Sequence, residues 1–181
     1  LPQECPGLEL ANSSQSYRWP TKILPSPDPS VAIARTEAET DAIVRLRYEL
    51  YVARDGKTYS HADHARRRLA DPVDDVSLNF YASDHGRVLS AVRLTRAKDA
   101  LTDAQMAMLV KASGIRRLKN VLVCSRFVAL PDVSARRAIV PTFRHVYRTG
   151  LYAGASISLL ATRPRLDGIF AKFGYRFAGL S

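Results

Sequence analysis

The stretch SRFVALPDVSARRAIVPTF, residues 125–143, governs how the rest of the chain is interpreted. It begins in an apolar run typical of a strand, passes through the segment PDVSARR and enters a pattern that predicts a helix from about Ala138 to Ala153. A helix N-terminus presents unpaired N–H groups and the positive end of the helix dipole, so Arg136 and Arg137 mark a candidate anion site. The segment contains no glycine, and Pro141 removes one N–H group near the expected helix start.

Two apolar runs flank this junction. NVLVCSRFVAL, residues 120–130, has no polar face, which predicts a strand inside a sheet. SISLLAT, residues 156–162, predicts a second buried strand after the helix. A strand, helix and strand in this order predict a parallel pair with a right-handed crossover, and ligands tend to bind where such strands end. We expect a last helix that has Pro164 in its first turn and runs to about Phe173. A final strand then starts in YRFAGL, residues 175–180.

The upstream half begins with a predicted strand and helix. VAIART, residues 31–36, alternates as a short strand, and Thr36 with Glu39 has the spacing of a capping box. The apolar period then predicts a helix from about Glu39 to Val52, in which Arg45 and Glu49 have the spacing of an i, i+4 ion pair.

A hairpin and a short helix follow. VSLNFYASDHGRVLSAVRLT, residues 76–95, predicts two strands with the bend at Asp84, His85 and Gly86. Thr102 and Gln105 have capping-box spacing before a short helix that Gly114 ends.

The order of these elements predicts one α/β domain over residues 31–181, with a mixed, centrally parallel sheet flanked by helices. Residues 1–30 contain six of the ten prolines and no sustained period, which predicts an extended arm or linker. Trp19 and Tyr17 are the residues able to pin this arm onto the domain. Neither a signal-peptide pattern nor a long apolar run is present, so we expect a cytoplasmic protein without a transmembrane segment.

The chain is basic, with 27 Lys and Arg against 17 Asp and Glu. A net charge of +10 favours association with acidic partners without choosing among them. Basic and aromatic residues are not interleaved as in nucleic-acid-binding motifs, so nucleic acid is not the expected partner.

Cys124, inside an apolar run, is interpreted as a small buried hydrophobe. His61, Asp63 and His64 lie in a polar loop without further ligands nearby, so no metal site is expected.

The order of the elements resembles the GNAT acyltransferase superfamily, and IFAKFGYRF, residues 169–177, is similar to its last helix and turn. RLRYELYVARDGKT, ADHARRRLADPVDD, HGRVLSAVRLT and SRFVALPD occur in the order and spacing of the long-chain N-acyl amino acid synthases and, more distantly, of the acyl-homoserine lactone synthases. The resemblance covers residues 33–177. It implies transfer of a fatty acyl chain, carried as acyl-phosphopantetheine of an acyl carrier protein or as acyl-CoA, onto the α-amine of an amino acid or a related small amine. It implies no permanently bound cofactor.

The resemblance also implies where the acyl donor binds. In GNAT enzymes a glycine-containing loop after the central strand holds the diphosphate of coenzyme A, and here the loop has no glycine. A carrier protein presents a smaller phosphodiester and an acidic surface, which Arg144 and Arg148 could meet on the same side of the helix. We therefore expect a carrier protein as donor, with acyl-CoA as the alternative. The expected donor-binding residues are Phe127, Val128, Ser134, Arg136, Arg137 and Ala138.

For catalysis we expect Glu49, Arg126 and Ser125, and for acceptor binding Arg47, Arg93 and Asp75, of which Arg47 could fix a carboxylate by a forked contact. A surface ion pair is the alternative for Arg47 and Glu49. Two side chains implied by the resemblance are absent: Val123 stands where the homoserine lactone synthases carry Glu, and Phe170 where many GNAT enzymes carry Tyr. A catalytically silent domain that docks an acidic carrier protein or another subunit is therefore the alternative function.

Overall fold

The computed structural model describes Trp19 and residues 25–28, 30–162 and 166–176. Five strands form one sheet in the order β1-β2-β3-β4-β5. Its strands are β1 (Val31–Ile33), β2 (Leu78–Asp84), β3 (Arg87–Arg96), β4 (Val121–Ala129) and β5 (Ile157–Leu160). The pairs from β1 to β4 are antiparallel, and β4 with β5 is parallel. The predicted mixed sheet is confirmed, but its parallel pair lies at one end of the described sheet and not at its centre.

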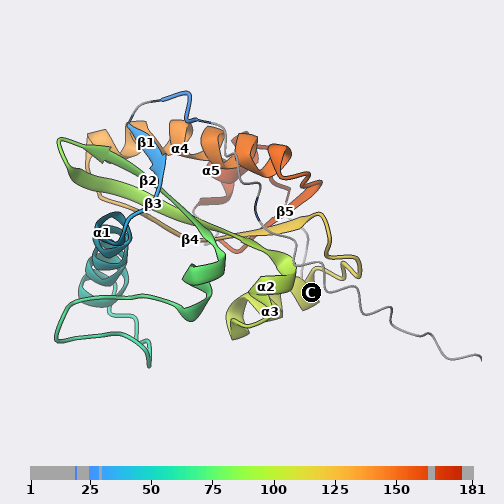
Figure 1. The fold of residues 1–181 in the computed structure, drawn as a ribbon, viewed down its shortest axis with the longest axis horizontal. Coiled ribbons are helices and arrows are strands. Elements are labelled where there is room, and N and C mark those ends of the chain that lie inside the picture. The colour runs from blue at the N-terminus through green and yellow to red at the C-terminus, as the bar shows by residue number, and fades with distance from the viewer. Residues whose placement is uncertain (1–18, 20–24, 29, 163–165, 177–181) are drawn as a thin grey trace, which may run out of the picture.

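Helices cover both faces of the sheet (Figure 1). The long helix α4 (Val133–Tyr152) and the short α5 (Asp167–Lys172) lie on one face. On the other face lie α1 (Glu37–Arg47), α2 (Ala97–Ala100) and α3 (Ala104–Ala112). Each face carries buried apolar side chains, with Phe80, Val92 and Phe143 in the cluster on the α4 face and Val110 and Val123 in a cluster beside α2 and α3.

The start of the first helix follows the predicted capping box. Thr36 Oγ1 accepts a hydrogen bond from the Glu39 N–H, and a Glu39 carboxylate oxygen accepts one from the Thr36 N–H. The predicted pair between Arg45 and Glu49 is wrong. Arg45 donates to Asp41 at 2.6 Å and Glu49 accepts from Arg67 at 2.8 Å, because the helix widens into a π-helical segment, η1 (Tyr48–Arg54), which changes the spacing between successive turns.

The hairpin is also confirmed, since β2 and β3 are joined at Asp84, His85 and Gly86. His85 and Gly86 both have positive φ, as a type I′ turn requires. The cap of α3 differs from the prediction. Asp103, and not Thr102, accepts from the N–H three residues on, because its carboxylate is the stronger acceptor at the helix start.

Helix α4 begins at Val133, five residues before the predicted start at Ala138. The Asp132 carboxylate accepts from the Ala135 N–H at 2.7 Å, and this cap starts the helix inside the expected loop. Pro141 therefore lies in the helix interior and removes the N–H that would bond the Arg137 carbonyl.

Trp19 is the described residue of the predicted N-terminal arm that contacts the domain most clearly. Its Nε1 donates to the Val76 carbonyl at 3.1 Å, and the Arg96 guanidinium lies 4.8 Å from its ring centroid. The predicted pinning by Trp19 is thus confirmed. Tyr17, Pro164 and most of the predicted final strand lie outside the described residues.

Candidate active site

A cluster of buried charges lies on the sheet face that α1 covers. It joins Arg47 of α1, Arg93 of β3 and Arg126 of β4 to two carboxylates, Asp71 and Asp74. Arg47 is 0% exposed and Arg93 1% exposed, so both guanidiniums depend on the cluster for their hydrogen bonds. The two carboxylates belong to the 3₁₀ helix η2 (Pro72–Val76) and to Asp71, the residue before it. The cluster therefore fixes α1, β3 and β4 to this segment.

Asp71 is the centre of the cluster. One of its oxygens accepts from Arg93 Nη1 and Arg126 Nε, each at 2.6 Å, and the other accepts from Arg126 Nη2 at 2.7 Å and faces His61 Nε2 at 2.8 Å. Burial opposes ionisation of this carboxyl, but the hydrogen bonds from Arg126 and the charges of the arginines outweigh it, so the pKa of Asp71 lies well below its ordinary range. Asp71 is thus an anion held by three arginine N–H donors, with His61 Nε2 beside it.

Asp74 holds the two arginines that are most deeply buried. Arg47 Nη1 donates to both of its oxygens, at 2.8 and 2.9 Å, and Arg93 Nη1 donates to one of them at 3.1 Å. Arg47 Nη2 donates to Asn79 Oδ1 at 2.6 Å. Arg47 and Arg93 thus have no surface to offer a bound molecule, contrary to the predicted acceptor-binding role.

A bulge in β4 brings Arg126 to this cluster. Ser125 pairs with Arg93 and Val128 with Ala91, so two residues of β4 stand opposite one residue of β3. Arg126 has φ +53°, in the left-handed region, and so its side chain lies on the same sheet face as that of Ser125. Arg93 Nε donates to Ser125 Oγ at 3.1 Å. The bulge thus places both of these predicted catalytic residues beside the buried charges.

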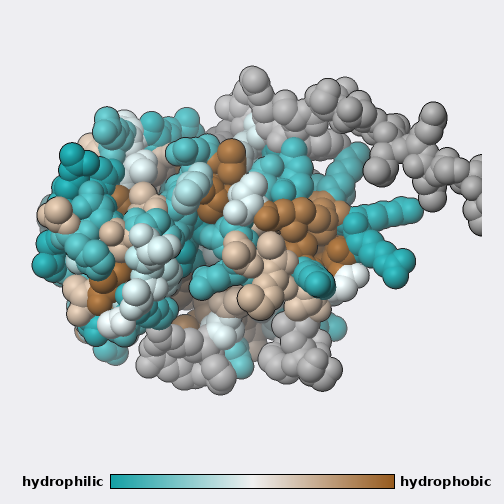
Figure 2. All heavy atoms as spheres, turned by 90° about the horizontal axis from the view of Figure 1, so that it is seen from below, coloured by the Kyte–Doolittle hydropathy of each residue, from teal (hydrophilic) through white to brown (hydrophobic). Residues whose placement is uncertain are grey.

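A cavity of about 570 Å³ opens next to Arg126, and we call it the acceptor-side cavity. Its walls come from the loop before η2, from η2 itself and from the residues around α2 and α3. The lining residues are Tyr59, His61, Asp71, Pro72, Val73, Val76, Asp99, Thr102, Asp103, Ala104, Gln105 and Arg126. Figure 2 shows the molecule from the side of α1, α2 and α3, where brown apolar side chains gather beside teal hydrophilic ones. Leu101, directly after α2, and Met108 of α3 are exposed, so this side has mixed polarity.

Two other predicted site residues lie outside this cavity. Asp75, expected to bind the acceptor, is exposed in η2, whereas its neighbour Asp74 pairs with Arg47 and Arg93. Glu49 is exposed and accepts two hydrogen bonds from Arg67, at 2.8 and 2.9 Å. A surface ion pair, the alternative that the sequence left open for Glu49, is therefore what the structure shows.

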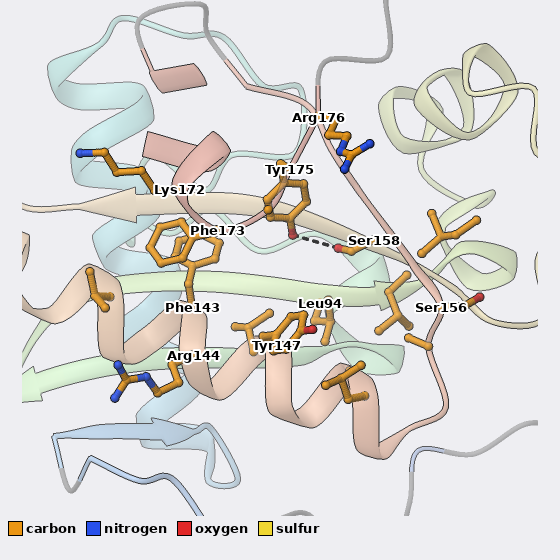
Figure 3. Close-up of a pocket in the computed structure, with 18 residues that line it drawn as sticks. Leu94, Phe143, Arg144, Tyr147, Ser156, Ser158, Lys172, Phe173, Tyr175 and Arg176 are labelled. Atoms are coloured by element: carbon orange, nitrogen blue, oxygen red, sulfur yellow. Dashed lines mark hydrogen bonds between the residues drawn. The ribbon is translucent and has the colours of Figure 1, made fainter. Parts of the chain in front are cut away.

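A second cavity, of about 750 Å³, lies on the other face of the sheet, between α4, β5 and the residues after α5 (Figure 3). Its floor includes Leu94 and Leu122, and Phe143 and Tyr147 of α4 form part of its wall. Tyr175 and Ser158 oxygens are 2.9 Å apart across it. Because apolar side chains predominate in this lining, we call it the apolar cavity.

Part of β4 has a free edge, and its residue Arg126 lines the acceptor-side cavity. The parallel pairing of β4 with β5 ends at Cys124 and Leu160, but β4 continues to Ala129. Within the described part of the chain, residues 125–129 therefore have no strand partner on the β5 side. The Phe127 carbonyl accepts from the Tyr51 hydroxyl at 2.8 Å, and Val128 is buried beside α1.

The first turn of α4 differs from the predicted anion site. Ser134, Arg136 and Arg137 are exposed there, and Ala138 is buried. Because the Asp132 carboxylate caps this turn, a second anion would meet its negative charge. Farther along the same helix Arg144, Tyr147 and Arg148 are exposed, Tyr147 to 63%. The basic surface of α4 thus extends well beyond its N-terminus.

Apolar side chains occupy the two positions at which the resemblance implies a catalytic Glu and Tyr. Val123 and Phe170 are both buried in the core. Cys124 is buried too, and burial raises the pKa of its thiol to about 12, which confirms that it is a small buried hydrophobe.

Among the described residues, no three His, Cys, Asp or Glu side chains gather as a metal site would require. No described helix has both the length and the apolar composition that crossing a membrane needs.

Sequence reasoning missed Asp71, Asp74, His61 and Tyr59. The signal for the two carboxylates is the segment DPVD, residues 71–74. The proline after the first Asp favours the start of a short helix, and such a helix brings the side chains of Asp71 and Asp74 to the same side. No local pattern marks His61 or Tyr59, since His61 contacts Asp71 through the path of a loop and Tyr59 accepts a hydrogen bond from Arg126 of β4, 67 residues away.

Solved structures share this fold. The CoA-dependent acyl-homoserine lactone synthase BjaI, solved with SAM and isopentyl-CoA, is 17% identical with a TM-score of 0.62, over 76% of this chain and 65% of that chain. FeeM, an N-acyl amino acid synthase from uncultured soil microbes, is 16% identical with a TM-score of 0.60, over 82% and 79%. A protein described as an acetyltransferase, from Agrobacterium tumefaciens, is 15% identical with a TM-score of 0.52, over 81% and 92%.

These likenesses define the class: the chain has the GNAT-like fold of acetyltransferases and acyl-homoserine lactone synthases. It spans about two thirds of the BjaI chain. No curated protein sequence matches it significantly. The model of the family described as N-acyl amino acid synthase FeeM matches residues 42–179, so the chain belongs to that family.

Proposed function

We propose that the protein transfers a fatty acyl chain from a thioester donor to the amine of an amino acid or a related small amine. The single observation that carries the proposal is the unpaired edge of β4, where Arg126 lines the acceptor-side cavity on one face of the sheet while the apolar cavity lies on the other face. A thioester arm lying along this edge has its acyl chain on one face and its carbonyl within reach of an acceptor on the other. Membership of the N-acyl amino acid synthase family supports this assignment.

The two cavities divide the substrates by polarity. The apolar cavity, with Phe143, Tyr147 and Leu151 in its wall, suits the acyl chain because burial of each CH₂ group contributes about 0.8 kcal/mol. The acceptor-side cavity contains carboxylates, a histidine and the Arg126 guanidinium, which suit a small molecule that carries both an amine and an acid group. Arg126 is the arginine of the cluster that reaches this cavity, so it takes the role of binding the acceptor carboxylate.

In this proposal Ser125 stabilises the transition state. Its Oγ accepts the hydrogen bond from Arg93, which leaves the hydroxyl proton free to donate. A thioester carbonyl held at the β4 bulge gains negative charge as the amine attacks, and a fixed donor there lowers the barrier. The remainder of the rate comes from holding the two substrates in line.

We further propose an acyl carrier protein as the donor, in preference to acyl-CoA. Three observations support it: the loop before α4 lacks glycine, the Asp132 carboxylate occupies the first turn of α4, and exposed arginines continue along the helix to Arg148. A diphosphate needs free backbone N–H groups at the helix start. A carrier protein needs a basic surface for its acidic one.

The alternative is a silent domain that binds a carrier protein without turnover. Val123 and Phe170, buried where the resemblance implies Glu and Tyr, favour this alternative. The test is to incubate the purified protein with acyl-carrier protein or acyl-CoA of several chain lengths and a mixture of amino acids, then to measure products by mass spectrometry. We expect N-acyl amino acids, formed faster from the carrier protein. Binding of the carrier protein with no product from either donor would support the silent domain.

A further inference from the structure

His61 and Asp71 form a hydrogen-bonded pair at the wall of the acceptor-side cavity. His61 Nε2 lies 2.8 Å from Asp71 Oδ1. The His61 side chain is 37% exposed, whereas that of Asp71 is 1% exposed. The pair thus has a buried carboxylate behind an imidazole that is open to the cavity and to solvent.

The arginines around Asp71 determine which ring nitrogen of His61 carries the proton. Because Asp71 is held as an anion by Arg93 and Arg126, it offers only acceptor oxygens, and Nε2 must be the donor. In the neutral ring Nδ1 is then an acceptor. Among the contacts of the described residues, Nδ1 of His61 makes no hydrogen bond, so its lone pair remains available.

The groups that face His61 suit a proton acceptor. The Tyr59 ring lies edge-on at 5.7 Å, and the Arg126 guanidinium lies over the Tyr59 ring at 4.9 Å and shares Asp71 with His61. The same cavity carries the carboxylates of Asp99 and Asp103. These carboxylates attract an ammonium group into the cavity, and the ionised Asp71 stabilises the imidazolium that forms when the proton arrives.

We propose that His61 is the general base of the reaction, which takes a proton at Nδ1 from the ammonium group of the acceptor. This inference rests on the proposed acyl transfer. Protonated amines are not nucleophilic, and Val123 leaves β4 without a carboxylate at the position where the resemblance implies one. A base from the loop before η2 supplies the missing function.

The proton and bond changes balance without a further reactant. The first proton of the ammonium group passes to His61 Nδ1 and from the exposed ring to water. The amine nitrogen then attacks the thioester carbon, and a C–N bond forms as the carbonyl π electrons move to oxygen. When the C–O double bond forms again, the C–S bond breaks with its electron pair on sulfur. The second nitrogen proton ends on the thiolate, which gives an amide and a thiol.

The test compares His61→Gln with wild type, because the Gln amide can still donate to Asp71 but cannot act as a base. His64→Gln is the matched control, since His64 is an exposed histidine of the same loop that contacts the Tyr48 hydroxyl at 3.0 Å and does not line the cavity. Urea unfolding of each variant verifies that it is folded. We expect kcat/KM for the amino acid at pH 7 to fall about 100-fold in H61Q and to stay within twofold in H64Q.

Two further measurements separate a base from a residue that only positions others. The loss in H61Q should shrink as pH rises, because the acceptor amine then loses its proton to water. It should nearly vanish with an aminooxy analogue of the amino acid, whose nitrogen is already neutral at pH 7. An equal loss with both acceptors, or H61Q within twofold of wild type, would overturn the role of His61 and leave acyl transfer intact. A wild-type protein without turnover from either donor would overturn both.

Discussion

Replacement of Asp71 by Asn removes one negative charge from the most deeply buried ionic cluster described in the molecule. Three guanidiniums, of Arg47, Arg93 and Arg126, share the two carboxylates of Asp71 and Asp74. D71N leaves three positive charges with a single negative one and replaces one of the acceptor oxygens by an NH₂ donor. That NH₂ group would face either an arginine or His61 Nε2.

The magnitude follows from this burial. Asp71 accepts two hydrogen bonds at 2.6 Å from different arginines, and charge-assisted bonds are the strong ones. Removing one partner of a buried ion pair costs about 3–5 kcal/mol, because it leaves an uncompensated charge away from water. For a domain of this size each kcal/mol lowers Tm by roughly 2–4 °C. We therefore expect D71N to lower the free energy of unfolding by about 3–5 kcal/mol.

Urea unfolding followed by circular dichroism measures this change. Asp75→Asn is the matched control, because Asp75 is exposed in the adjoining turn and its replacement should change the free energy of unfolding by less than about 0.5 kcal/mol. If D71N cost less than about 1 kcal/mol, or no more than D75N, the charges would not hold α1, β3 and β4 together as argued.

Two further predictions concern Glu39 and the basic surface of α4. Hydrogen bonds from the Arg35 N–H and then from the Tyr81 hydroxyl lower the pKa of Glu39 to about 2 from its usual 4.5, so its stabilisation is present above pH 4.5 and is lost as pH falls toward 2. As pH falls from 4.5 to 2, the urea midpoint of E39Q should therefore decrease less steeply than that of wild type. Parallel plots of urea midpoint against pH for the two proteins would contradict the lowered pKa of Glu39. The variant R148E, at an exposed arginine outside the lining of the apolar cavity, should raise KM for acyl-carrier protein by about tenfold and leave KM for acyl-CoA within twofold; an equal effect on both donors would argue against docking on α4.

Local patterns predicted the elements whose causes are local. The capping box at Thr36 and Glu39 depends on residues three apart, and the hairpin bend depends on two residues that tolerate positive φ. The apolar run around Cys124 similarly requires an interior strand, whatever its neighbours. The start of α4 was misplaced because the pattern of apolar residues begins later than the Asp132 cap.

The candidate site was predicted only in part, because its contacts join distant segments. Ser125 and Arg126 lie in the strand that the apolar run predicts, but only the β4 bulge turns both toward one face. Arg47 was expected to bind an acceptor, since its sequence neighbours do not reveal that Asp74 and Asn79, 27 and 32 residues later, accept its hydrogen bonds. The contact of His61 with Asp71 is likewise formed by the path of the loop before η2, which has no repeating pattern.

The most direct measurement of the central claim is the mass spectrum of lipid extracts from bacteria that express the chain. Acyl transfer to amino acids predicts new lipids, absent from vector-only cells, whose masses equal an amino acid plus a fatty acid minus water. The same spectrum identifies the acyl length and the acceptor. Extracts without such lipids, from cells in which the folded protein is abundant, would contradict the account.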